Sequence, residues 1–183
     1  SGSSLVFVFV LGLLITFLVL AAQFESYIHP FVIMLTVPTA VFGGVLGLLL
    51  TGGTLNLYSQ IGIVMLVGLA AKNGILIVEF ANQLRDRGYP FDDALRTASL
   101  TRLRPILMTG ITTAAGAIPL IIASGAGAET RKTIGVVVLG GVLLATFLTI
   151  FLVPAAYKLL ARGTTSPEAV KRQLAKEEGS LAA

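Results

Sequence analysis

The sequence predicts an all-α membrane protein in which five transmembrane helices form one bundle. Hydrophobic residues make up 55% of its 183 residues and charged residues only 12%, whereas soluble domains carry about 25% charged residues. One core in water could not bury so much apolar surface, so a lipid bilayer must act as the solvent for most of the chain. Five apolar stretches also reach the length of about 20 residues that a membrane-spanning helix needs.

The first two apolar stretches cover residues 5–24 and 30–50. At about 1.5 Å per residue, a helix over 5–24 extends roughly 30 Å, which is the thickness of the hydrocarbon core. The second stretch contains a kinking proline and several small residues, which let helices approach closely in lipid. These residues are Pro38, Gly43, Gly44 and Gly47.

The third predicted span covers residues 58–84 and is followed by the most polar interior segment, 85–104. We expect 85–104 to form a cytoplasmic loop. Within it, a proline at a helix start and apolar residues on one side predict a short surface helix over 90–100.

The fourth and fifth predicted spans cover residues 105–124 and 133–160. The fourth opens on Pro105 and has Pro119 as an expected kink. The bundle is therefore expected to cover 5–162 as a whole. A polar tail, 163–183, follows it.

Lys72 is the most informative residue, because it is a cation inside the apolar run 61–80. It lies eight residues before Phe80, or roughly 12 Å at the helical rise of about 1.5 Å per residue. No Asp or Glu lies at the same depth, and a lysine can extend its charge to the headgroups only from near a helix end. An unpaired ammonium at this depth marks a functional site, with its counter-charge expected from another helix.

The distribution of basic residues predicts the orientation in the membrane. If the first span starts outside, only Arg131 and Lys132 fall outside, and Lys72 lies in the membrane. The other ten basic residues then fall on the cytoplasmic side, as positive-inside sorting requires: Arg85, Arg87, Arg96, Arg102, Arg104, Lys158, Arg162, Lys171, Arg172 and Lys176. We therefore expect residues 1–4 outside the cytoplasm and the tail inside. Because the chain starts outside with no Met and no signal-peptide layout, it is expected to be a fragment of a longer protein.

Five short motifs resemble one family, the resistance-nodulation-division (RND) efflux pumps, and in particular their hydrophobe/amphiphile multidrug branch. A-K-N-G-I-L-I-V-E-F-A at 71–81 is similar to the family's tenth transmembrane helix, and R-L-R-P-I-L-M-T at 102–109 to the entry into the eleventh. Supporting matches are A-A-Q-F-E-S at 21–26, S-G-A-G-A at 124–128 and F-L-V-P-A-A-Y at 151–157. The resemblance implies that the chain is the C-terminal membrane part, the last five of twelve spans.

The resemblance also implies a function, which is drug/proton antiport driven by the proton-motive force. It gives Lys72, Arg102 and Thr109 the positions of an intramembrane proton relay. The paired aspartates that would complete this relay belong to the family's fourth span, which the chain lacks. Spacing agrees with the grouping, since Arg102 and Thr109 are seven residues apart and share one helix face.

The same relay predicts a coupling mechanism. Ionised carboxylates would hold Lys72 by opposite charge, and protonating one of them would remove much of that attraction. The lysine would then move and the helices repack, which would couple proton entry to an alternating rock of the bundle.

Further properties are implied by the resemblance alone. They are a homotrimer in a bacterial inner membrane, a periplasmic adaptor, an outer-membrane channel, and hydrophobic or amphiphilic small-molecule substrates. No cofactor is implied beyond the proton gradient, and neither a metal nor a nucleic acid is expected.

Each relay residue has a structural alternative. Lys72 could snorkel or stabilise the bundle through a static pair, Thr109 could bond back to its own helix, and Arg102 could be an interfacial anchor. Asn73 could bond across helices or fill space. His29, the single histidine, is expected to be an interfacial residue, since no second metal ligand lies near it.

Other functions remain as alternatives to multidrug export. One is a membrane scaffold or sensor that does not transport, and another is a different RND branch that exports metals or lipids. An ion channel would need polar residues repeated along one helix face, a pattern that this sequence lacks. No phosphate-binding loop supports transport driven by ATP.

Overall fold

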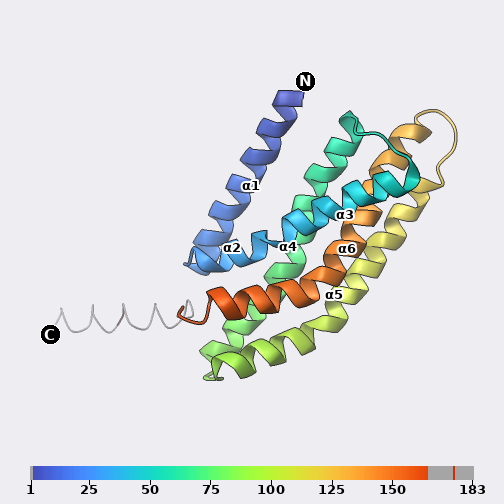
Figure 1. Ribbon diagram of the computed structural model, residues 1–183. Helices are drawn as coiled ribbons and strands as arrows, with labels where there is room; N and C mark the ends of the chain where they lie inside the picture. Colours follow the sequence, from blue (N-terminus) through green and yellow to red (C-terminus); the bar gives the residue numbers. More distant parts are fainter. Residues whose placement is uncertain (1, 165–174, 176–183) are drawn as a thin grey trace.

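The computed structural model describes residues 2–164 and 175, and all regular structure among them is helical (Figure 1). The helices are α1 (Gly2–Phe24), α2 (Ile28–Met34), α3 (Thr36–Thr51), α4 (Leu57–Asp86), α5 (Phe91–Ile121) and α6 (Ala128–Leu160). With α2 and α3 taken as one span, five helices are long and apolar enough to cross a membrane. The predicted all-α membrane bundle is confirmed.

The second span is interrupted at Leu35, between α2 and α3. Pro38 explains the position of this break. A proline has no N–H to donate to the carbonyl four residues earlier, here that of Met34, and its ring crowds the same carbonyl. The sequence predicted a continuous helix with a kink over 30–50; the structure has two helices in its place.

The expected loop at 85–104 is largely helical, so its predicted limits are corrected. The third span runs on to Asp86, and α5 begins at Phe91 and continues through Pro105. A separate surface helix over 90–100 is therefore wrong, because its residues form the first turns of α5. Ala, Leu and Arg favour helix throughout this part of the chain. Figure 1 shows α5 as one bent helix, and Pro105, which lies inside it, explains a bend in place of a start.

The core of the bundle is built around α6, which packs against α3, α4 and α5. Glycines line the crossing of α3 and α6. A Cβ added at Gly43 would lie 2.7 Å from the carbonyl oxygen of Gly140, and one added at Gly140 would lie 2.6 Å from the carbonyl oxygen of Gly43. The two backbones therefore touch, which confirms that small residues of the second span allow a close approach.

The start of α4 is fixed by a capping box. The Asn56 Oδ1 accepts hydrogen bonds from the backbone N–H groups of Tyr58 and Ser59, at 3.0 and 2.9 Å. The Asn56 N–H in turn donates to the Ser59 hydroxyl at 2.8 Å. Three backbone donors are satisfied in this way, which fixes the N-terminal end of the helix that carries Lys72.

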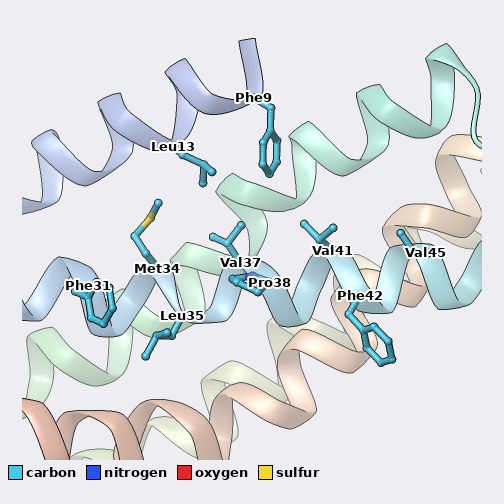
Figure 2. Close-up of a pocket in the computed structure, with 10 residues that line it drawn as sticks. All are labelled: Phe9, Leu13, Phe31, Met34, Leu35, Val37, Pro38, Val41, Phe42 and Val45. Carbon is cyan, nitrogen blue, oxygen red and sulfur yellow. The ribbon is translucent and has the colours of Figure 1, made fainter. Parts of the chain in front are cut away.

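The first helix stands apart from the rest of the bundle (Figure 1). Only 6% of its apolar window is buried, compared with 44% to 50% for the spans formed by α2–α3, α4 and α6. An apolar groove of about 700 Å³ lies between α1 and the α2–α3 span. In Figure 2, Phe9 and Leu13 extend into it from α1, while Met34, Val37 and Val41 extend from the opposite side.

Candidate functional site

Lys72 and Thr109 line one small cavity between α4, α5 and α6, which we name the Lys72 cavity. Its volume is about 20 Å³, which is room for about one water molecule. Lys72 is the single charged residue that lines it. Its complete lining is Leu69, Lys72, Asn73, Thr109, Gly110, Thr113 and Val142. The structure thus brings together two of the three predicted relay residues.

Lys72 forms no ion pair with any residue that the structure describes. Among the described residues, an ion pair joins Lys158, in the last turn of α6, to Asp92, in the first turn of α5, at 3.2 Å. The Lys72 side chain is exposed on the flank of the five-helix bundle. Glu79, on the same helix, is seven residues further on. Within 2–164, therefore, the charge of Lys72 has no acidic partner.

Thr109 faces the cavity and also bonds to its own helix. Its hydroxyl donates to the Ile106 carbonyl at 3.0 Å, and its own carbonyl accepts a bond of 2.8 Å from the Thr113 hydroxyl. This is the geometry that the structural alternative predicts. A hydroxyl that donates backward still has lone pairs that can accept a hydrogen bond. The Thr109 hydroxyl can therefore still accept a hydrogen bond from a donor in the cavity.

Arg102 is not brought to the Lys72 cavity. Its guanidinium lies 4.5 Å from the centre of the Phe80 ring, which is a cation–π contact between α5 and α4. Its Nε is buried and has no hydrogen-bond partner among the described residues. Phe80 lies eight residues beyond Lys72 on α4, so Arg102 lies about two turns from the cavity.

Thr146 of α6 lies directly behind the cavity and was not predicted. The Asn73 carboxamide donates to its hydroxyl at 3.4 Å. A Cβ added at Gly110 would lie 2.7 Å from the Cγ2 of Thr146 and 2.8 Å from its Oγ1. Asn73 thus bonds across helices, which was one of its two predicted roles. Nothing in the sequence marks Thr146, because a threonine in an apolar helix is ordinary.

A second polar cluster lies where α2, α4, α5 and α6 meet, and it corrects the prediction for His29. His29 is completely buried and not interfacial. Its ring stacks on that of Tyr157, with centroids 5.6 Å apart and planes inclined by 13°. Tyr157 stacks in turn on Phe91 at 5.4 Å and 6°, and Phe24 meets His29 edge-on at 5.9 Å. Four elements are joined by this stack.

The hydroxyl of Tyr157 is hydrogen-bonded on both sides. It donates to the Asn82 Oδ1 at 2.7 Å and accepts a bond from Arg85 at 3.0 Å. The Arg85 guanidinium also lies 5.1 Å from the centre of the Phe91 ring, and it donates to the backbone carbonyl of Thr164. These contacts connect α4, α5 and α6 to the segment after α6. We interpret the cluster as structural.

Comparison with known proteins points to one family of membrane transporters. Residues 1–161 match the model of the AcrB/AcrD/AcrF family. The chain is 44% identical over 167 residues, or 87% of its length, to an uncharacterized transporter of Haemophilus influenzae. It is 42% identical over 170 residues, or 92% of its length, to the toluene efflux pump membrane transporter TtgB and the antibiotic efflux pump membrane transporter ArpB, both of Pseudomonas putida. The chain spans 16% of the length of each of these relatives.

Proposed function

Because the chain belongs to the AcrB/AcrD/AcrF family, whose relatives here are efflux pump membrane transporters, we propose that it forms the last five of twelve spans of a proton-driven efflux transporter. Its specific contribution is the Lys72 part of an intramembrane proton relay. Drug/proton antiport by the complete protein is the activity that this relay would serve.

The observation that carries the proposal is the unpaired charge of Lys72. The ammonium lines a cavity with Thr109 and has no acidic partner within residues 2–164. A lysine at membrane depth is costly unless a carboxylate or water offsets its charge. The exposed flank of α4 leaves Lys72 open to another helix. Paired aspartates in the remainder of the polypeptide would satisfy that charge.

The proposed cycle follows from the strength of this pairing. In a membrane interior of low dielectric, two ionised aspartates attract Lys72 strongly, and a proton on one of them weakens the attraction. Lys72 then turns toward Thr109 and the cavity, where a hydroxyl oxygen accepts its N–H. The change in position shifts α4 against α5 and α6, and that shift drives the rocking of the bundle. Arg102, beside Phe80, lies where a proton would enter from the cytoplasmic side.

The remaining parts of the proposal concern the setting of the whole protein. We place it in a bacterial inner membrane as a homotrimer, with residue 2 on the periplasmic side and residue 164 in the cytoplasm. Its partners are a periplasmic adaptor and an outer-membrane channel, and its substrates are hydrophobic or amphiphilic small molecules. The names of the Pseudomonas putida relatives, which mention toluene and antibiotics, support this substrate class over metals or lipids.

Lys72→Ala tests the proposal in the protein as its gene encodes it. The variant should lose drug resistance and proton-coupled efflux while its expression and assembly stay intact, because the carboxylates lose their mobile counter-charge. Lys72→Arg should lose most activity as well, since a planar guanidinium keeps the charge but not the compact, rotatable ammonium. Growth in drug gradients and efflux in everted membrane vesicles measure the effect.

Lys132→Ala is the matched control, because it also removes a lysine ammonium, but in the first two turns of α6 and away from the cavity. It should retain resistance. Retained resistance in Lys72→Ala would contradict the relay. The absence of two adjacent aspartates from the preceding membrane helices would favour the scaffold or sensor.

A further inference from the structure

We infer that Thr146 is a positioning residue for the Lys72 cavity, which sets both the rotation of the helix carrying Lys72 and the distance to the helix carrying Thr109. The inference rests on the proposed function, because it assigns a role within the same relay. Thr146 lies on α6 and does not line the cavity itself. It acts through the residues that directly follow Lys72 and Thr109 in the sequence, Asn73 and Gly110.

The contact with Asn73 favours one rotation of α4. Asn73 is 6% exposed, and its carboxamide points at α6, where it donates to the Thr146 hydroxyl at 3.4 Å. Successive residues of an α-helix are about 100° apart around its axis, from about 3.6 residues per turn. With Asn73 held against α6, Lys72 is turned toward the flank of the bundle. If this bond were lost, α4 could turn further, and the direction of Lys72 would be less closely defined.

The contact with Gly110 fixes the separation of α5 and α6. The distances of 2.7 and 2.8 Å from an added Cβ to the Cγ2 and Oγ1 of Thr146 are shorter than side chains tolerate. Thr146 is therefore seated directly against the backbone of α5, next to Thr109. Both branches of the threonine side chain take part, so its shape as well as its hydroxyl sets the separation.

Through these two contacts, α6 positions both α4 and α5 beside the cavity. Val142, one turn before Thr146, lines the cavity directly. Among the lining residues only Lys72 carries a charge, and the nearest charged residues along α4 and α5 are Glu79 and Arg104. At 3.4 Å, the bond between Asn73 and Thr146 is long for a hydrogen bond between neutral groups. A small rotation of α4 breaks it, so it defines one resting position without locking the helix.

The test compares three variants of the protein as its gene encodes it, assayed for proton-driven efflux in everted vesicles over a range of pH. Thr146→Val keeps the shape of the side chain but removes the hydroxyl. The midpoint of the curve of efflux rate against pH should therefore move. Turnover should fall roughly fivefold, which is the size expected for one lost neutral hydrogen bond. The substrate KM should stay unchanged. Thr146→Ser restores the hydroxyl and should return the midpoint toward that of the wild type.

Thr149→Val is the matched control. Thr149 is buried on the same helix, and its hydroxyl has no hydrogen-bond partner among the described residues. Removing that hydroxyl should leave the pH midpoint where it was. Asn73→Ala removes the same bond from α4 and keeps the test open if Thr146→Val fails to fold. The double variant that combines Thr146→Val with Asn73→Ala should lose no more turnover than the more severe of the two single variants.

Different outcomes separate this inference from the proposed function. If Lys72→Ala abolishes efflux but Thr146→Val and Asn73→Ala keep the wild-type midpoint, the positioning role is wrong and the relay stands. A lower amount of folded protein with an unchanged midpoint also overturns the positioning role, because it shows that Thr146 is structural. If Lys72→Ala keeps proton-coupled efflux, the proposed function itself fails.

Discussion

Tyr157 illustrates how a single side chain joins distant parts of this chain. Its ring is stacked between those of His29 and Phe91, and its hydroxyl bonds to Asn82 and Arg85. The stack depends on ring shape, whereas the two hydrogen bonds depend on one oxygen atom. The two contributions can therefore be separated by a single substitution.

Tyr157→Phe should lower the free energy of unfolding by about 1 to 3 kcal/mol, because it leaves the buried Asn82 and the half-buried Arg85 without the hydroxyl. The ring stack should survive. Thermal unfolding in detergent measures the change. Tyr27→Phe is the control, since Tyr27 is 77% exposed and should show no shift. Equal melting temperatures for both variants would contradict the structural role of the hydroxyl.

Some residues of the candidate site could be predicted from sequence and others could not. Lys72 is visible because a charge in an apolar run is rare, and Thr109 because it belongs to a motif. Both line one cavity, although their relay role remains a prediction. The burial of His29 was missed because its partner Tyr157 lies at the other end of the chain. Thr146 was missed for a similar reason, since its role depends on packing between three helices.

At the scale of whole helices, the crossing of α3 and α6 is the tightest feature and gives a sharp prediction. Gly43→Ala should lower the free energy of unfolding by about 1 to 3 kcal/mol, the usual cost of overpacking. The reason is that the new Cβ would lie 2.7 Å from the Gly140 carbonyl oxygen. Thermal or denaturant unfolding in detergent provides the measurement.

Gly12→Ala provides the comparison for Gly43→Ala. A Cβ at Gly12 meets nothing within 4 Å, so alanine should stabilise α1 by up to about 1 kcal/mol through helix propensity. Equal destabilisation by both substitutions would show that the α3–α6 crossing is looser than described.

The sequence predicts the membrane spans well, but it predicts their exact boundaries less well. Hydropathy located all five spans, because spanning length is a strong signal. It did not locate the break at Leu35 or the continuity of α5 through Pro105. Both depend on how the chain accommodates a proline, which breaks one helix and only bends the other. Prolines at 38 and 105 look alike in a sequence, and the surrounding packing decides between the two outcomes.

At the scale of the whole molecule, the predicted orientation can be tested by thiol labelling. The chain has no cysteine, so single cysteines can be placed in a cysteine-free background at Thr54, Tyr89 and Ser124, three positions between helices. An impermeant maleimide added to intact spheroplasts should label Thr54→Cys and Ser124→Cys but not Tyr89→Cys, because basic residues cluster near Tyr89. The reverse pattern would overturn the orientation.

The continuity of α5 has a mechanical consequence for the whole molecule. Its 31 residues extend about 46 Å at about 1.5 Å per residue, well beyond a hydrocarbon layer of about 30 Å. Roughly a third of the helix is therefore expected to project past the lipid, with Asp92 and Arg96 on this projecting arm and Thr109 on the arm that follows Pro105. The two arms belong to one helix, with the bend at Pro105 between them. We therefore expect that a displacement of the first arm, produced by contacts outside the membrane, changes the tilt of the turn that carries Thr109.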